Sequence, residues 1–258
     1  PGITNPYVRH PGITASAIAS LDEVSKGRSF VGIGAGGGLT LNPLGIERLK
    51  PATTVSETVV ALRGLFSGER VDLEGNEFSL KSASLNYGRE NIEIFLAGRG
   101  KRMTQLGAEL GDGFYLSYIN KDFLPGHLKS LRNAAKRDPF KIVYSTMIVS
   151  SQKEFEEARA ALSFRLVDSP QEVKDHIGMT EEINNQIKTS LSEGGPSDAA
   201  KYVPSEWVEQ FVITGSSSEA SEELMSLFDE NGIDEFQLPI GNPEEAEKVI
   251  SRTSKMFN

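Results

Sequence analysis

The 258-residue chain contains no cysteine, which excludes disulfide bonds, thiolate metal sites and a cysteine nucleophile. This absence fits a reducing cytoplasm, where we expect the protein to act. Histidine is scarce, and the three histidines His10, His127 and His176 are isolated from one another, so we expect no histidine-built metal site. The sequence also has no run of apolar residues long enough to span a membrane and no basic-then-apolar leader, so we expect no membrane partner.

Lysine and arginine are also fewer than aspartate and glutamate. The net charge is −9, the isoelectric point is near 5.0, and no long basic run interrupts the acidic background, so a nucleic-acid partner is not expected. A content of 38% hydrophobic and 24% charged residues is ordinary for a globular protein. The chain opens at Pro1-Gly2-Ile3-Thr4 without a methionine or an approach to a first strand. We therefore expect that an N-terminal piece precedes it.

Glycine is plentiful, and it gathers where apolar strands are predicted to end. Residues 30–33 predict a short strand that runs into the glycine-rich residues 34–38. A second strand, predicted over residues 92–96, is followed by residues 97–101, which read AGRGK. Residues 2–5 have the character of a third such strand end. Small residues at the carboxyl ends of parallel strands are typical of ligand sites in α/β proteins.

These strand ends together predict a site for a phosphate-bearing cofactor, because amides at helix N-termini bind anions and Arg99 and Lys101 add positive charge. Neither glycine segment is a P-loop, and the first is a poor match to the Rossmann fingerprint. The alternative interpretations are a flexible loop between strand and helix, and solvated surface charges at Arg99 and Lys101.

Strands alternate with longer helices along most of the chain, which favours a parallel α/β sheet and a (β/α)8 barrel over an open sheet. About six β/α units are recognisable, and we expect the first two units of the barrel to be missing. The other predicted strands cover residues 114–119, 142–149, 211–214 and 236–240. Residues 54–57 and 216–219 each have the spacing of a capping box. We expect one domain over residues 1–258, with a mostly helical insertion at about 152–204 that packs on one edge or acts as a lid.

Several side chains have two interpretations. His10 precedes a proline that begins a helix, so it is a helix-entry residue or else a catalytic base. Asp22 and Glu23 are predicted to be solvated on the outer side of that helix. Trp207 and Tyr202 are expected in the core, with a place in the wall of a substrate pocket as the alternative.

Several segments carry a family resemblance: residues 5–11 (NPYVRHP), 15–28 and 31–36, and further residues 97–100, 111–113 and 215–232. In these segments the chain resembles the luciferase-like flavin and deazaflavin oxidoreductases. The resemblance is strong over residues 1–120, returns near 211–240 and is weak between them. Within this superfamily the chain most resembles the methylenetetrahydromethanopterin reductases, which use the deazaflavin coenzyme F420.

The resemblance implies a TIM barrel that begins here at its third strand, and a cis peptide bond between Gly2 and Ile3 behind the cofactor ring. It implies that Ile3 presses against the deazaflavin and that Asn5 reaches the ring or its tail. The predicted cofactor-binding residues are Gly2, Ile3, Thr4, Asn5, Gly34, Ala35, Gly36, Thr40, Ala97, Gly98, Arg99, Gly100, Lys101, Met103 and Thr104. Of these, Ala35, Gly36 and Thr40 would lie along the cofactor. Gly100, Lys101, Met103 and Thr104 would cradle its phosphate.

The activity implied is hydride transfer between F420 and a pterin-like one-carbon carrier, in either direction. Gly37 stands where relatives often have a carboxylate, so a sugar-phosphate dehydrogenase activity is disfavoured and no catalytic residue is named. The alternatives are an FMN-dependent monooxygenase of the same superfamily and a catalytically silent barrel that serves as a binding or interface module. The resemblance also implies a homodimer or higher homo-oligomer, for which the helix over residues 13–24 is the candidate contact.

Overall fold

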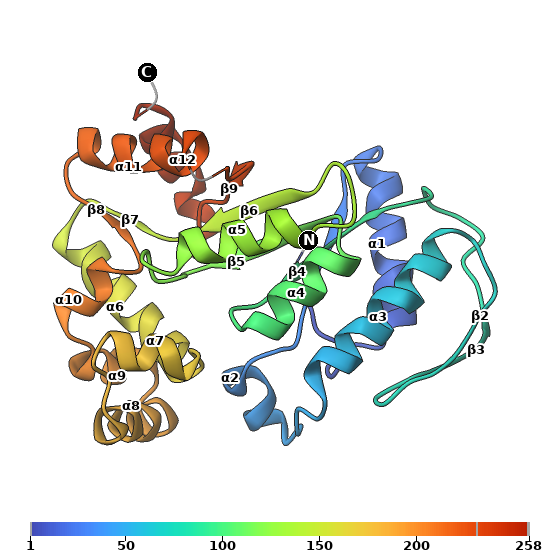
Figure 1. Cartoon of the computed structure of the whole chain (residues 1–258), viewed down its shortest axis with the longest axis horizontal. Coiled ribbons are helices and arrows are strands. Elements are labelled where there is room, and N and C mark those ends of the chain that lie inside the picture. Colours follow the sequence, from blue (N-terminus) through green and yellow to red (C-terminus); the bar gives the residue numbers. More distant parts are fainter. Residues whose placement is uncertain (1, 231, 257–258) are drawn as a thin grey trace. The chain divides into compact units, whose positions relative to one another are not determined.

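The structure is a computed structural model that describes residues 2–230 and 232–256 (Figure 1). Helices alternate with short strands along the chain, as the predicted α/β class requires. The described residues group into two compact units. The first contains the residues up to Tyr115 together with Ser130–Lys141, and the second contains Leu116–Lys129 together with the residues from Ile142 onward. That residues 1–258 form a single domain stays a prediction.

Parallel strands form the sheet of the first unit. They are β1 (Phe30–Gly34), β4 (Glu93–Ala97) and the first residues of β5 (Gly113–Ser117). Strand β4 lies between the other two, with Gly34 opposite Ala97 and Ala97 opposite Tyr115. Most side chains of β1 and β4 are buried, which is typical of parallel strands covered by helices.

Helices and a hairpin complete the first unit. The helices are α1 (Pro11–Ser25), α2 (Gly38–Leu41), α3 (Pro51–Phe66) and α4 (Lys101–Leu110), with a 3-10 turn at Asn42–Leu44. Helix α1 packs against α3, and the two lie side by side in Figure 1. Strands β2 (Val71–Glu74) and β3 (Ser79–Ala83) form the antiparallel hairpin that alternation in this segment predicted. Helix α5 (Leu124–Ala134) is divided between the two units.

The start of α1 confirms the helix-entry interpretation of His10. Its Nδ1 accepts a hydrogen bond from Gly12 N at 3.1 Å and caps the helix, while Pro11 occupies the first helical position. Asp22 on the same helix corrects a prediction, since it is 1% exposed rather than solvated. Its carboxylate binds the Arg89 guanidinium, which is far away in the sequence.

The capping box predicted at residues 54–57 is wrong. Helix α3 begins earlier, at Pro51, whose fixed backbone suits a first helical position. Thr54 is therefore inside the helix, and its Oγ1 donates back to Lys50 O at 3.3 Å. The Glu57 carboxylate instead accepts from Asn76 N at 2.9 Å and so holds the turn of the β2–β3 hairpin. The box predicted at residues 216–219 is confirmed, because Ser216 and Glu219 each accept from the other's backbone amide.

The second unit contains two pairs of parallel strands. They are β6 (Lys141–Ser145) with β9 (Glu235–Phe236), and β7 (Ile148–Val149) with β8 (Ile213–Thr214). The single strand predicted over residues 142–149 is thus divided in two. Thr146 lies at the break, where its buried Oγ1 donates to Phe211 O at 2.5 Å. The strand predicted over residues 236–240 ends at Phe236, and the residues after it form a loop.

Helices make up most of the second unit. They are α6 (Gln152–Val167), α7 (Gln171–His176), α8 (Glu181–Glu193), α9 (Pro196–Ala199), α10 (Ser205–Glu209), α11 (Ser217–Asp229) and α12 (Ala246–Ser254), with 3-10 turns at Ala200–Tyr202 and Pro243–Glu245. The segment predicted as a helical insertion packs around an apolar cluster that includes Leu162, Leu166 and Ile187. Trp207 is 5% exposed within this cluster and Tyr202 packs against it, which confirms their expected place in the core.

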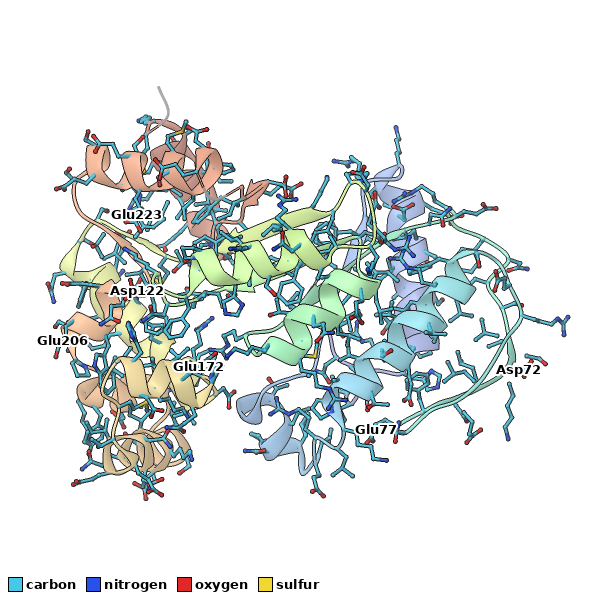
Figure 2. All side chains as sticks on the ribbon, viewed as in Figure 1. Asp72, Glu77, Asp122, Glu172, Glu206 and Glu223 are labelled. Carbon is cyan, nitrogen blue, oxygen red and sulfur yellow. The ribbon has the colours of Figure 1, made fainter. Side chains whose placement is uncertain are left out.

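Two ion pairs hold the loop that follows β5. Lys121 Nζ lies 2.7 Å from Glu223 Oε1, and His176 Nε2 lies 2.8 Å from Asp122 Oδ2. Asp122 and Glu223 are labelled in Figure 2. Because neighbouring residues of one loop bind two different helices, α11 and α7, the loop is fixed from two sides. Over the described residues, none of the helices has the length and apolar character needed to cross a membrane.

Candidate functional site

Two of the predicted cofactor segments meet at the carboxyl ends of the strands in the first unit. Thr4 bridges Ile33 in parallel: Thr4 N donates to Gly32 O at 2.9 Å, and Gly34 N donates to Thr4 O at 2.9 Å. Gly34 in turn lies opposite Ala97 of β4, at the start of the third segment. Residues 2–5, 34–36 and 97–104 therefore follow adjacent strand ends, and we name them, together with Thr40, the strand-end site.

The Gly2–Ile3 peptide bond is cis, as the family resemblance implied. The Ile3 side chain lies over β1 and is 46% exposed, so it presents an apolar face at the strand end. A Cβ atom at Gly32 would lie 2.6 Å from Ile3 Cδ1, and one at Gly34 would lie 2.9 Å from Ile3 Cγ2. Ile3 can occupy this place only because both strand positions are glycine. The role of Gly32 was missed, although a glycine inside an apolar strand was a visible signal.

Asn5 and Gly36 contact each other beside Ile3. Asn5 is 9% exposed, and its Oδ1 accepts from Tyr7 N at 3.1 Å and from Val8 N at 3.2 Å, which fixes the turn after residue 5. Gly36 has φ +71°, a conformation that side chains with a Cβ rarely adopt. A Cβ there would also lie 3.2 Å from Asn5 Cγ. The chain thus brings these two predicted residues together and excludes a side chain at Gly36.

The loop that contains Arg48 and Leu49, which no sequence pattern indicated, is hydrogen-bonded to Gly36 and Tyr7. Arg48 Nη1 donates to Gly36 O at 2.6 Å, and Tyr7 Oη donates to Leu49 O at 2.6 Å. Burial raises the pKa of the Tyr7 hydroxyl above its usual value, so it stays protonated as a donor. Both contacts join residues far apart in the sequence, and no local motif could have indicated them.

Helix α4 begins shortly after β4, and the glycines Gly98 and Gly100 precede its first residue. Gly100 is the N-cap residue, and a Cβ there would meet no atom within 4 Å. At Gly98 a Cβ would lie 2.6 Å from Met103 Cβ, so glycine is needed where the first turn of the helix packs back on the loop. The first amides of a helix have no partner inside the helix, and together with the helix dipole they attract an anion.

The remaining predicted residues differ in how exposed their side chains are. Lys101 is exposed and Arg99 is half-buried. Thr104 is 2% exposed, and its Oγ1 donates to Gly100 O at 3.3 Å, so its hydroxyl already serves the helix start. Thr40 is exposed on α2, one turn beyond the glycine run. That these residues bind a cofactor stays a prediction. In residues 2–230 and 232–256 there is no cluster of three or more acidic or histidine side chains that could hold a metal ion.

Comparisons with known proteins place the chain in one family. The family model described as luciferase-like monooxygenase matches residues 1–235. The 5,10-methylenetetrahydromethanopterin reductase of Archaeoglobus fulgidus is 34% identical over 239 residues, which cover 88% of this chain and 72% of that protein. The corresponding reductase of Methanolobus tindarius is 28% identical over 263 residues, which cover 97% of this chain and 80% of that protein.

The fold comparison gives the same result. The coenzyme F420-dependent tetrahydromethanopterin reductase of Methanopyrus kandleri superposes with a TM-score of 0.80 at 25% identity, covering 99% of this chain and 81% of the solved one. This match confirms the predicted α/β fold class of the luciferase-like TIM barrel. The chain belongs to the luciferase-like monooxygenase family.

Proposed function

We propose that the chain is an oxidoreductase that binds coenzyme F420 and transfers hydride between it and a methylene-bridged, pterin-like one-carbon carrier. The observation that carries the proposal is the strand-end site, in which Ile3 presents an apolar face over Gly32 and Gly34 beside the open start of α4. The names of the similar reductases support the choice of coenzyme and carrier.

The residues present fit a flat ring that bears a phosphate tail. The exposed part of Ile3 offers apolar area to the ring, and the absence of a Cβ at Gly32 and Gly34 lets Ile3 lie against β1. The N-terminal end of α4, which begins after its N-cap residue Gly100, suits the phosphate. Arg99 and Lys101 add positive charge to the same loop.

F420 supplies the hydride when it is bound, and the protein contributes orientation and electrostatics. Ile3, which lies on the glycines of β1, would orient the ring by contact. Arg48 donates to the carbonyl of Gly36 and so restrains the loop that would border the ring. The Asn5 Oδ1 is used by its own turn, and its Nδ2 is therefore the group that we assign to a ligand.

Binding of the two coenzymes tests the proposal. We expect F420 to lose fluorescence on titration with the full-length protein and FMN to be unaffected. Reduced F420 should then be consumed when methylenetetrahydromethanopterin is added. Quenching of FMN alone would favour the monooxygenase alternative, since reduced flavin activates oxygen and a deazaflavin does not. Failure of both coenzymes to bind would favour a silent barrel.

We also propose a homodimer that forms through α1. Its outward face carries Ile13, Leu21 and Val24, which are 64%, 43% and 81% exposed. An apolar stripe of this kind on a helix is typical of an interaction surface. Sedimentation should give a species of twice the 28.1 kDa chain mass, and Val24→Glu should convert it to monomer. A monomer in the unmodified protein would contradict this proposal and leave coenzyme binding unaffected.

We infer a cytoplasmic location, which the absence of cysteine supports because a chain without disulfides loses nothing in a reducing compartment. Fractionation of cells that produce the protein checks this, and recovery of most of the protein in the medium or with the membranes would contradict it.

A further inference from the structure

The β2–β3 hairpin contacts two chain segments that border the strand-end site, although no residue of the hairpin belongs to that site. Its turn, residues 75–78, is hydrogen-bonded to helix α3 and includes Glu77, which is labelled in Figure 2. One of the two segments is the loop of residues 48–50, and the other is the turn of residues 5–10. The hairpin therefore lies one contact away from the groups that hold the site.

Glu57 of α3 binds the hairpin turn through both of its carboxylate oxygens. One oxygen accepts from Asn76 N at 2.9 Å, and the other accepts from Asn76 Nδ2 at 2.5 Å. Gly75 leaves room for this contact, since a Cβ there would lie 2.9 Å from Glu57 Oε2. Hydrogen bonds to a charged acceptor are stronger than those between neutral groups, so the turn is held on α3 at one place.

The Asn76 side chain also holds Lys50, the residue that precedes α3. Lys50 Nζ donates to Asn76 Oδ1 at 3.2 Å. An ammonium group only donates and a carboxylate only accepts, so the Asn76 amide has a single orientation between Lys50 and Glu57. Lys50 has φ +43°, in the left-handed region, and such a backbone persists where the surrounding contacts over-determine it.

Two hydrogen bonds connect the loop of residues 48–50 to the strand-end site and its turn. Arg48 Nη1 donates to Gly36 O, and Tyr7 Oη donates to Leu49 O, both at 2.6 Å. Arg48 and Leu49 directly precede Lys50 in the chain. The backbone conformation of Lys50 therefore determines where both of these groups lie.

The hairpin also contacts the turn that follows the strand-end residues 2–5. His10 Nε2 donates to Ser79 O at 3.2 Å, and the centre of its ring lies 5.7 Å from that of Phe78. Phe78 is 8% exposed, so it anchors this end of the hairpin in the core. The hairpin, the loop of residues 48–50 and the turn of residues 5–10 thus each contact the other two.

We propose that Asn76 and Glu57 are positioning residues for coenzyme binding, which act through Lys50 on the loop that precedes it. Neither residue belongs to the strand-end site. While they hold Lys50, the loop keeps its hydrogen bond to Gly36 O and the site is ordered before the coenzyme arrives. Without them, binding must also order the loop, which lowers the affinity. The proposal rests on the proposed function, since it concerns the affinity for F420.

Glu57→Gln tests the proposal because it brings two donors together. The new amide places an N–H group against one of the two Asn76 donors, and turning the Asn76 amide over only moves the clash to Lys50 Nζ. In fluorescence titrations of the full-length protein, we expect the dissociation constant for F420 to rise about tenfold. Hydrogen exchange of residues 34–50, measured without coenzyme, should become about fivefold faster.

The double variant Glu57→Gln/Asn76→Asp should restore both values. A carboxylate at position 76 accepts from the new amide at position 57 and from Lys50 Nζ, so every donor again has an acceptor. The dissociation constant and the exchange rates should return to within about threefold of those of the unmodified protein.

Asp72→Ala is the matched control. It removes one negative charge, as Glu57→Gln does, and it also removes a hydrogen bond of the same hairpin, from Ser82 N to Asp72 Oδ1 at 2.7 Å. Asp72, labelled in Figure 2, lies on β2 and outside the turn. Affinity for F420 and the exchange of residues 34–50 should both stay within about threefold of the unmodified protein.

Three results would overturn the proposal: a double variant as weak as Glu57→Gln, unchanged exchange in Glu57→Gln, or equal losses in Glu57→Gln and Asp72→Ala. Failure of the unmodified protein to bind F420 would contradict the proposed function instead. The exchange rates are measured without coenzyme, so they still decide whether Glu57 and Asn76 position the loop.

Discussion

Gly36→Val is expected to weaken F420 binding about a hundredfold, which corresponds to about 2.7 kcal/mol. Gly36 has φ +71°, and holding a residue with a side chain there costs about 1–3 kcal/mol. The new Cβ would also lie 3.1 Å from Leu41 Cδ1 and 3.2 Å from Asn5 Cγ. Residue 36 would have to move, and its carbonyl would leave the Arg48 guanidinium that holds it. Fluorescence titration of F420 measures the loss.

Gly45→Val is the control for the cost of placing a side chain at a residue with positive φ. Gly45 follows the same loop and has φ +66°, but a Cβ there would meet no atom within 4 Å. Both variants should lower the melting temperature, whereas only Gly36→Val should lose the coenzyme. Similar F420 affinities for the two variants would show that the close contacts at Gly36 do not shape the binding site, and would move the coenzyme away from this loop.

Much of the strand-end site could be predicted because its signals are local. Glycine after a short apolar strand marks a strand end wherever the strand packs, and the segments with Gly34 and Ala97 do become neighbours in the sheet. The cis bond at Gly2 followed from a family resemblance rather than from any pattern in the residues themselves. Pro51 was also a local signal for the start of a helix. The capping-box spacing that begins at Thr54 indicated a later start and competed with it.

Contacts between distant residues could not be predicted in this way. Arg48 and Tyr7 are ordinary polar side chains in the sequence, and their partners Gly36 and Leu49 are backbone carbonyls that carry no signature. Tyr118 in the second unit is a similar case, because its left-handed backbone depends on what surrounds it. A single sequence reports periodicity and local turn chemistry, while these contacts depend on the tertiary packing.

Asp22 is the clearest error of this kind. It follows an apolar stripe on α1 and was predicted to be solvated, like its neighbour Glu23, which is indeed exposed. The fold instead buries the Asp22 carboxylate beside the start of β1, where Ser29 N donates to Oδ1 at 2.9 Å. Arg89 Nε lies 3.0 Å from the other oxygen. An aspartate at the inner edge of a helix looks the same in sequence as one at its outer edge until the partner is known.

Asp22→Asn is expected to lower the free energy of unfolding by about 2 kcal/mol. The amide keeps the shape of the side chain but places an N–H group or a neutral oxygen against the Arg89 guanidinium. Breaking a fully buried ion pair costs about 3–5 kcal/mol, and the smaller value applies because the Arg89 side chain is 36% exposed. Urea denaturation followed by circular dichroism measures the change.

The contribution of Asp22 to stability is expected to decrease as the pH falls. Burial by itself would raise the pKa of Asp22, but the hydrogen bonds from Arg89 and Ser29 N outweigh it and hold the pKa below the usual value. The unfolded chain therefore takes up the proton first as the pH falls. The stabilisation by Asp22 is complete above about pH 5 and declines as the pH drops through 4 towards the lowered native value. The difference in stability between the unmodified protein and Asp22→Asn should shrink over this range.

Glu93→Gln separates the buried pair from the surface charge on the same arginine. Glu93 Oε2 lies 2.9 Å from Arg89 Nη2, and the Glu93 side chain is 50% exposed. Exposed pairs of this spacing contribute about 0.5 kcal/mol or less, so Glu93→Gln should scarcely change the urea midpoint. If the two variants lost equal stability, burial would not be what makes Asp22 important. A large loss confined to Asp22→Asn would show that the junction of α1 with β1 depends on one desolvated carboxylate. That junction leads directly into the strand on which Ile3 lies.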